Sequence, residues 1–430
     1  MTTEQQVVEI VNKLQKFSDS FISDHGIEKA REKKKLVKAE LMKSLEEVKL
    51  LEPTCEKTTY LLQYGRALNI LPEYNKECED CLSKVVKRDP SLIEAWNLLG
   101  ETFWKKSDNL AAKDCFEGSL KREKNKIALR SLSMVLRQVK CTKSEEAISN
   151  VIKSVDLAKM SVDIDKNDGM SWFVLGNAYL SLFFASDQSA QTLLMAMTSY
   201  FQAEKVDTRS SYNPDLHFNM AQAYRYEESY TKAFKGWQQA LKLDPEWNEP
   251  KIRTNELMCY LIKVNNLVEQ RGKLKAKRLH GFIKSIDEKA LGPLSPKSLA
   301  DKNIKLDNVK LSELQEGRNA DKLVVGKVVC NFADVAQLPF TFAMVDSNGE
   351  CCAVTVYNLA QGKGVIIGDS VAVPEPFFSK VDLTLLDKDS TQCAFSSIRV
   401  NTPDSLIVNG KKLSSEHCAF AKASMNRREM

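Results

Sequence analysis

The sequence predicts an all-α solenoid of repeated helical hairpins, followed by a small all-β barrel. Large apolar residues and small residues recur at one spacing through residues 60–250. After residue 319, short β-rich runs bounded by turn residues take their place. Between the two patterns, residues 288–318 contain two glycines and two prolines, which is typical of a linker.

Length and composition place the chain among globular proteins. Its 430 residues are enough for two or three domains, and 43% of them are apolar and 28% charged. The net charge of +5 is mild, so contact with nucleic acid would need a local basic patch. Eleven scattered cysteines favour reduced thiols over a disulfide framework. Reduced thiols fit the cytosol or nucleus. We see no signal peptide and no membrane span.

The first 52 residues predict two helices. Residues 3–24 place six apolar side chains on one helical stripe, which His25 and Gly26 end. A strongly charged helix follows over residues 27–51 and ends before Pro53. Terminal repeats of a solenoid are usually atypical, so we interpret residues 1–52 as a pair of capping helices. Partner binding is the alternative.

Residues 53–287 carry the repeats. Residues 93–124 contain the clearest unit, whose marker residues are Trp96, Leu99, Gly100, Phe103, Ala112 and Phe116. Residues 213–245 hold a second clear unit, and residues 60–90 and 126–165 hold degenerate ones. The front half returns at residue 169, but its back half comes eight residues late, which predicts an insertion around Phe184–Thr192. The spacing W-x2-L-G-x2-Y, then A-x3-F-x2-A, then P, at a period of about 34 residues, is the tetratricopeptide pattern.

Stacked hairpins of this kind form a curved solenoid whose concave wall comes from the first helices. Positions two, five and nine of each unit are expected to line it: Glu94, Asn97 and Glu101; Met170, Phe173 and Asn177; Asp215, Phe218 and Gln222. The Asn177 amide is suited to clamp a peptide backbone, because it both donates and accepts hydrogen bonds. With Arg130 and Arg137 on the helix between, the wall predicts a site for a short extended peptide carrying both signs of charge. Ordinary surface polarity is the alternative.

A basic segment follows the repeats. After Pro250 a helix is expected through about Gln270, and then into RGKLKAKRLHGFIK, which crowds five cations into eight residues. Helical spacing would set Lys273 and Lys277 one turn apart on a like-charged ridge. Such a ridge either contacts an anionic partner or is a solvated face.

The β-rich region spans residues 319–412 and is predicted to form a Greek-key barrel of the oligonucleotide/oligosaccharide-binding (OB) type. Its expected strands are Lys322–Cys330, Phe340–Val345, Ala353–Tyr357, Ser370–Val373 and Ser396–Val400, with a hairpin turn at Asp346–Gly349 and a short helix after Tyr357. Residues 340–357 carry no Lys or Arg, so a scaffold role is favoured over single-strand binding. Residues 413–430 are expected to be a disordered tail.

Enzymatic constellations are hard to find. His217, one of four histidines, occupies the repeat position usually held by a packed Trp. Cys78 and Cys81 lie in a helical back half with no second pair, so we interpret them as packing residues and not as zinc ligands. We predict no catalysis, no metal and no cofactor.

Several runs resemble the tetratricopeptide repeat protein 5 family, also called Strap: SLSMVLRQ (131–138), NPDLH (213–217), LPFTFAMVDS-x-G (338–349) and IIGDSVAVPEP (366–376). The resemblance covers roughly residues 60–410. It implies a non-enzymatic adaptor that recognises the N-terminal Met-Arg-Glu motif of nascent tubulin at the ribosome exit tunnel. Such an adaptor triggers decay of tubulin mRNA through an mRNA-decay adaptor. The family's second role, a nuclear stress-response transcription cofactor that bridges a histone acetyltransferase and its activator partners, is the alternative.

The resemblance also implies site residues. Arg137 would bind the Glu of the peptide, and Asp215 with Glu249 would bind its Arg. Lys275 and Lys277 would contact ribosomal RNA near the exit tunnel, a contact led by the phosphate backbone. Two cellular locations, cytoplasm and nucleus, follow from the two roles.

Overall fold

The computed structural model describes residues 2–186, 188–286, 288–295, 306–332, 339–360, 362–385 and 391–418. The chain divides into two compact units between Arg253 and Thr254. No helix in these ranges is both long enough and apolar enough to cross a membrane.

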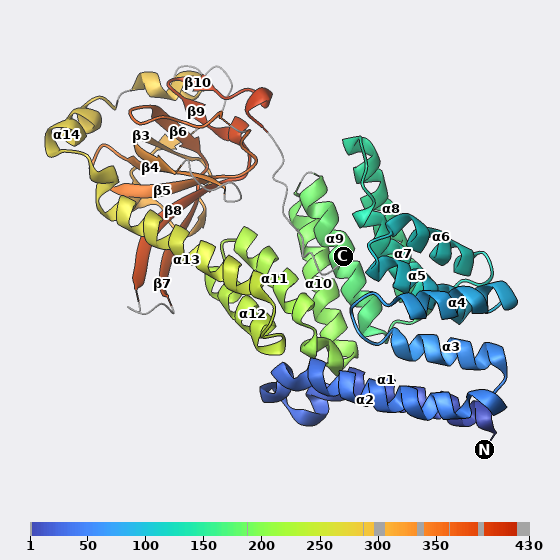
Figure 1. The fold of residues 1–430 in the computed structure, drawn as a ribbon. Helices are drawn as coiled ribbons and strands as arrows, with labels where there is room; N and C mark the ends of the chain where they lie inside the picture. The colour runs from blue at the N-terminus through green and yellow to red at the C-terminus, as the bar shows by residue number, and fades with distance from the viewer. Residues whose placement is uncertain are drawn as a thin grey trace. The chain divides into compact units, whose positions relative to one another are not determined.

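The first unit is the expected solenoid of helical hairpins (Figure 1). Its paired helices are α1 (Thr3–His25) and α2 (Ala30–Leu51), α3 (Lys57–Leu68) and α4 (Lys76–Arg88), α5 (Ile93–Lys105) and α6 (Asn109–Leu120), α7 (Lys126–Gln138) and α8 (Ser144–Ile164), α9 (Gly169–Ala185) and α10 (Ala190–Val206), and α11 (Pro214–Tyr226) and α12 (Tyr230–Leu243). Helix α13 (Asn248–Glu269) follows and continues into the second unit. The tetratricopeptide prediction is confirmed.

Local chemistry explains where these helices begin. A side-chain oxygen just before the first turn accepts a hydrogen bond from a first-turn amide in seven of them, at Thr2, Glu56, Asn75, Asp108, Asn125, Asp168 and Asn213. Such caps satisfy amides that the helix itself leaves without an acceptor. The polar residues that precede these helices therefore fix where each of them starts.

Glycines at the repeat seam let paired helices approach closely. A Cβ atom added at Gly176 of α9 would lie 2.5 Å from the Tyr200 ring of α10, and one at Gly100 would lie 2.7 Å from the Phe116 ring. Tyr200 is fully buried by this approach, as is Trp237 in the last hairpin. The large and small residues of the repeat pattern therefore face each other across each pair.

The insertion expected around Phe184–Thr192 is not an inserted loop. Instead, α9 and α10 are each 17 residues long, whereas α5 has 13 and α6 has 12. The extension is held by aromatic packing, because the Phe183 ring lies edge-on to the rings of Phe184 (5.0 Å) and Tyr226 (4.8 Å). The extra residues thus lengthen both helices of the hairpin.

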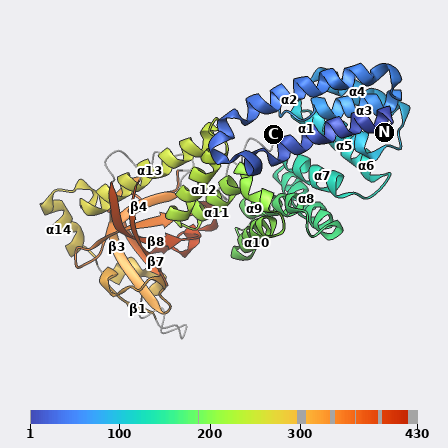
Figure 2. The same ribbon diagram turned by 90° about the horizontal axis from the view of Figure 1, so that it is seen from below.

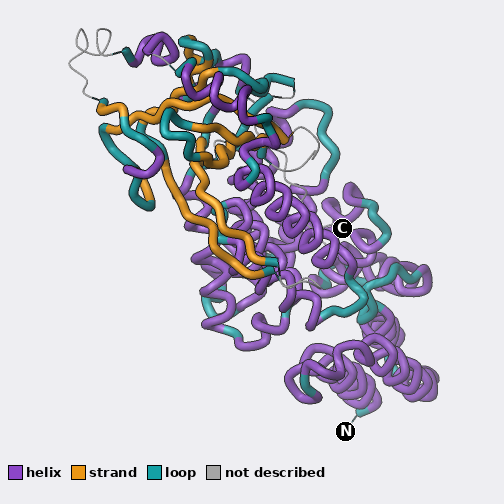
Figure 3. The backbone as a smooth tube through the Cα atoms, turned by 90° about the vertical axis from the view of Figure 1, so that its left-hand side faces the viewer, coloured by secondary structure: helices purple, strands orange, loops and turns teal. Residues whose placement is uncertain are grey.

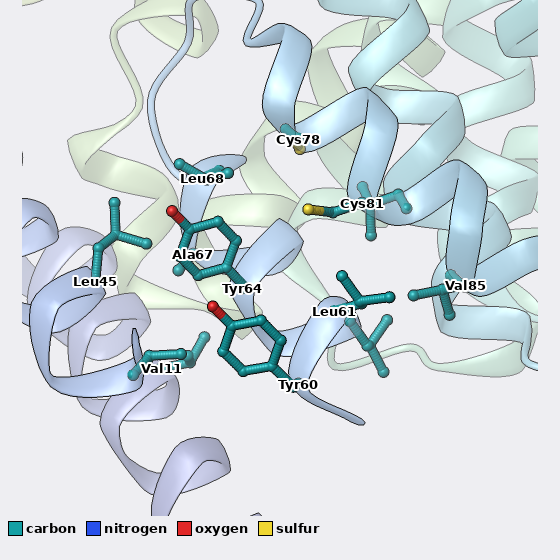
Figure 4. Close-up of a cluster of buried hydrophobic side chains, with 14 of the residues drawn as sticks. Val11, Leu45, Tyr60, Leu61, Tyr64, Ala67, Leu68, Cys78, Cys81 and Val85 are labelled. Carbon is teal, nitrogen blue, oxygen red and sulfur yellow. The ribbon is translucent and has the colours of Figure 1, made fainter. Parts of the chain in front are cut away.

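The N-terminal helices pack on the first repeat, and also reach the last one. Figure 4 shows Val11 and Leu45 beside Tyr60 and Tyr64 of α3. At the other end of α1, Phe21 and its neighbours form a separate buried cluster with Val37 of α2 and Leu243 of α12. The view in Figure 2 shows α1 and α2 running along the solenoid. The pair covers α3 as a cap would, and in addition it spans the hairpins between α3 and α12.

The second unit is a curled sheet, drawn in orange in Figure 3, and it has the expected OB-type fold. Its strands are β1 (Asp307–Asn308), β2 (Gly317–Arg318), β3 (Lys322–Phe332), β4 (Phe340–Val345), β5 (Cys351–Val356), β6 (Ser370–Pro374), β7 (Phe377–Thr384), β8 (Gln392–Val400), β9 (Ile407–Val408) and β10 (Lys411–Lys412). The order is β10-β9-β6-β3-β4-β5-β8-β7-β2, and β1 pairs with β3. Strands β5 and β8 run parallel, so the sheet closes through residues far apart in sequence.

The barrel begins earlier than expected. Strands β1 and β2 lie within the predicted linker 288–318, and they pair with β3 and β7. Leu311 and Leu314, from the same segment, are buried in the barrel core. Apolar residues between the prolines and β3 therefore make residues 307–318 part of the sheet.

Three other barrel predictions need correction. Strand β7 was not expected, because Lys380 and Asp382 interrupt its apolar pattern. No helix follows Tyr357 in the described residues 357–360, where Leu359 forms a bridge with Cys418. Residues 413–418 are not a disordered tail, since Leu413 packs against the core. Residues 419–430 lie outside the described residues.

Candidate peptide-binding groove

The first helices lie side by side as the wall of the solenoid. Helix α9 contacts α7 on one side and α11 on the other. Because the two helices of each hairpin run antiparallel, the first helices of successive hairpins run parallel to one another. Arg137 lies in the last turn of α7, and Asp215 lies in the first turn of α11. A helix of 13 residues is about 20 Å long, so Arg137 lies toward one edge of the wall and Asp215 toward the other.

Arg137 is half-buried and held in one direction. Its Nη1 donates to the Ser133 carbonyl (3.1 Å) and to the Ser133 hydroxyl (2.9 Å). That hydroxyl donates in turn to the Ser154 carbonyl of α8 (2.8 Å). Ser133 occupies the glycine position of its repeat, and its small size lets α8 approach. The guanidinium is therefore oriented before any ligand arrives, which reduces the entropy lost on binding.

Two carboxylates occupy helix N-termini. Asp215 is partly exposed in the first turn of α11, where the amides favour negative charge. Glu249 is in the first turn of α13 and is 35% exposed, with Oε1 2.8 Å from an Arg253 Nη2 that is itself buried. Arg253 was not predicted as a site residue, although its i+4 spacing from Glu249 was a signal in the sequence. The carboxylate is oriented by this arginine while its surface remains accessible.

Four side chains expected to line an open groove, Asn97, Phe173, Asn177 and Phe218, are buried instead. The Asn177 oxygen accepts hydrogen bonds from the Tyr200 hydroxyl (2.8 Å) and from Asn219 Nδ2 (2.9 Å). The Phe173 ring packs near Tyr200, and the Phe218 ring packs against Trp247, with ring centroids 4.7 Å apart. Repeat position predicts the face on which a side chain lies, but the neighbouring helix decides how deeply it is covered. Here Asn177 ties α9 to α10 and α11.

Arg130 is engaged within the wall. Its Nη1 lies 2.8 Å from Asp168, the residue that caps α9, and Lys126 lies near the same carboxylate at 3.7 Å. Lys126 also pairs with Asp165 at 2.6 Å. Much of the positive charge expected from Arg130 is therefore balanced by Asp168.

The basic segment is broken, so the expected ridge of Lys273 and Lys277 is wrong. Gly272 has a φ of 67°, and a Cβ there would lie 2.5 Å from the carbonyl oxygen of Val329 in β3. The next helix, α14 (Ala276–Lys284), begins after an extended Lys275. Lys275 and Lys277 therefore lie at the start of α14, and the helix exposes both.

The Cys78 and Cys81 side chains belong to the core of the first repeats (Figure 4). Burial raises the pKa of the Cys78 thiol to about 11. Since the thiolate is the form that binds zinc, this environment disfavours a metal role. Across the described ranges, no group of three or more His, Cys, Asp or Glu side chains could hold a metal ion.

The geometry can be compared with known proteins. A family model, Tetratricopeptide repeat protein 5 OB fold domain, matches residues 305–422, and a Tetratricopeptide repeat model matches residues 93–126. Tetratricopeptide repeat protein 5 of Homo sapiens is 42% identical over 421 residues, which cover 97% of this chain and 95% of that protein. Its counterpart in Mus musculus is 43% identical with the same coverage.

A solved tetratricopeptide repeat protein of Thermus thermophilus is 16% identical, with a TM-score of 0.39 over 46% of this chain and 96% of that one. The match at 305–422 agrees with strands β1 and β2 belonging to the barrel. Repeats and barrel together are those of a protein-interaction adaptor. With identity above 40% across nearly the whole length, the chain belongs to the tetratricopeptide repeat protein 5 family.

Proposed function

We propose that the chain is a non-catalytic adaptor that recognises the N-terminal Met-Arg-Glu motif of nascent tubulin at the ribosome and triggers decay of tubulin mRNA. In this role it works in the cytoplasm, and it hands the signal to an mRNA-decay adaptor. The observation that carries the proposal is the separation of charge along the wall, with Arg137 toward one edge and Asp215 toward the other. The chain's membership of the family supports it.

The charge separation fits adjacent residues of opposite sign. Successive side chains of an extended peptide point in opposite directions, so a neighbouring Arg and Glu reach opposite edges of the wall. Asp215 and Glu249 would receive the Arg, and Arg137 the Glu. Each charge-assisted pair contributes about 1.5–3 kcal/mol. A peptide held so lightly benefits from a second anchor, which a ribosome contact supplies by raising its effective concentration.

Arg137→Ala tests the groove. Capture of tubulin nascent chains by crosslinking should fall at least about tenfold, because the Glu of the peptide loses its partner. Arg88→Ala is a matched control, since Arg88 is an exposed arginine in the last turn of a second helix, α4. Undiminished crosslinking by Arg137→Ala, with a folded protein, would refute the assignment.

The ribosome contact is tested separately. In Lys275→Glu with Lys277→Glu, ribosome co-sedimentation should drop, while binding of an isolated Met-Arg-Glu peptide persists. The matched control reverses two exposed lysines elsewhere in the barrel unit, Lys411→Glu with Lys412→Glu. If ribosome co-sedimentation is unchanged in the variant with Lys275→Glu and Lys277→Glu, the start of α14 is a solvated face.

The second candidate function is a nuclear stress-response cofactor that bridges a histone acetyltransferase and its activator partners. Residues 340–357 of the barrel carry no Lys or Arg, which favours a protein scaffold over a nucleic-acid binder. Fractionating the native protein on a sucrose gradient separates the two roles. Association with ribosomal fractions supports the first, and its exclusive presence in nuclear protein complexes supports the second.

A further inference from the structure

A second row of acceptors lies on the wall at α5, away from Arg137, Asp215 and Glu249. Glu94, Asn97 and Glu101 are three and four residues apart, so they share one face of that helix. The two carboxylates are 48% and 44% exposed. Carboxylates are thus the accessible groups of this face.

The two nearby cations, Arg66 and Lys105, are less exposed than the carboxylates. Lys105 pairs with Glu101 at 3.2 Å, and it also donates to both the backbone and the side-chain oxygens of Asn69. The Arg66 Nε lies 3.8 Å from Glu94 Oε1, beyond the usual 2.7–2.9 Å of a charge-assisted hydrogen bond. Glu94 is therefore only loosely compensated.

Asn97 contributes a buried acceptor with no donor. Its Nδ2 donates to Asn125 Oδ1 (3.2 Å), and the residue is only 7% exposed. Asn125 fixes this orientation, because its own Nδ2 donates to Ser119 while its Oδ1 accepts from the Ala128 amide. The Asn97 oxygen is left without a hydrogen-bond partner among the described residues.

The neighbouring helix α3 repeats the feature. Gln63 is also buried, and its amide oxygen lacks a donor in the described part of the chain. It lies one turn before Arg66, the residue that joins α3 to Glu94 of α5. A buried acceptor without a donor is costly, so two on adjacent helices of one wall call for an explanation.

We propose that this α3–α5 surface is a second binding site, which takes an arginine side chain from a segment of a second protein. The guanidinium offers five donors and no acceptor, which matches a surface rich in acceptors. Its planar fork pairs with carboxylates such as Glu94 and Glu101 better than the point charge of a lysine does. The exposed carboxylates repel nucleic-acid phosphates, so the occupant is a protein. An adaptor with two separate sites can hold two proteins at once.

The probe is a fluorescein-labelled peptide Gly-Ser-Arg-Gly-Arg-Gly-Ser, and its binding to the full-length chain is measured by fluorescence anisotropy. A second peptide replaces both arginines with citrulline, which keeps the shape and removes the charge. The arginine peptide should bind at least about tenfold more tightly than the citrulline peptide. It should also lose about tenfold in Glu94→Gln and Glu101→Gln, but not in Glu117→Gln, whose carboxylate lies on the second helix α6.

Asn97→Leu separates binding from folding. The substitution removes the orphaned oxygen at similar volume, and Asn125 keeps the Ala128 amide as a donor. The melting temperature should stay level or rise, while the arginine peptide binds about tenfold more weakly. If Asn97 had a purely structural role, the substitution would lower the melting temperature and leave binding of the arginine peptide unchanged.

The proposed tubulin site has its own control. Arg137→Ala should leave binding of the arginine peptide unchanged, so failure of one proposal does not imply failure of the other. Three results would overturn the α3–α5 site: no binding up to ~1 mM peptide, equal binding of the citrulline peptide, or full binding by Asn97→Leu.

Discussion

The side-chain hydrogen bonds within the solenoid and those within the second unit span different distances in the sequence. In the solenoid, side-chain hydrogen bonds join neighbouring repeats, as between Trp104 and Gln138, which are 34 residues apart. In the second unit, Tyr260 and Thr341 bond across 81 residues, and Asn265 accepts from the Ala394 amide across 129. A repeat therefore depends on a local code of large and small residues, whereas the barrel depends on pairings that no local pattern contains.

The largest expected effect tests how far damage spreads from one repeat. Trp237 is fully buried in α12, and Trp237→Ala should cost about 3–5 kcal/mol through lost contacts and a cavity. Hydrogen exchange should show reduced protection in the solenoid helices, with the strands β3–β5 still protected. Equal loss of protection in the strands would break the distinction between the two units.

A pH-dependent prediction tests the local contacts within the solenoid. Burial alone raises the pKa of Glu79, but hydrogen bonds from Lys76, Tyr74 and Lys106 outweigh it and hold the pKa at about 2. A lowered folded-state pKa stabilises the protein above the unfolded value near 4.5, and this stability is lost as the pH falls toward 2. Glu79→Gln should therefore cost up to about 3 kcal/mol at pH 7.

Denaturant titrations from pH 7 to pH 2 measure this effect. The difference between Glu79→Gln and the unmodified chain should shrink below pH 4.5. Glu123→Gln, at an exposed glutamate, is the control and should show little change at any pH. A difference that persists at pH 2 would contradict the assignment.

The smallest expected effects form a matched pair of glycines. Gly176→Ala should destabilise by about 1–3 kcal/mol, because the new methyl group meets the buried Tyr200 ring. Gly281 lies inside α14 with nothing within 4 Å of an added Cβ, so Gly281→Ala should stabilise by about 0.5–1 kcal/mol. Thermal melts of both variants check the signs. If both substitutions changed the stability in the same direction, packing against Tyr200 would not control the effect at Gly176.

The sequence predicted the solenoid almost completely, since its marker residues and helix caps act within one repeat. It also identified Arg137 and Asp215 as charges on the wall. It could not predict that Asn177 is covered, because that depends on Tyr200 and Asn219 from two other helices. It missed the break at Gly272 for a related reason: the constraint comes from Val329, far along the chain.

The barrel shows the same division. Strands with continuous apolar runs, such as β4 and β6, were predicted within one or two residues. Strand β7 alternates irregularly between buried and exposed positions, and it becomes a strand only through its long pairing with β8. Asp346 was predicted in a turn, but its buried carboxylate also accepts the Leu311 amide and so connects the supposed linker to the hairpin.

One contact breaks the solenoid's local rule, the cluster in which Phe21 of α1 meets Leu243 of α12. Open repeat arrays behave as one-dimensional chains whose end units fray and melt independently. Here α1 and α2 contact the array near both of its ends, so the first and last hairpins are linked through the N-terminal pair. An end hairpin can then open only if the N-terminal pair is released or the remaining repeats move with it. The solenoid should therefore melt in a single cooperative step, with the N-terminal helices setting its cooperativity.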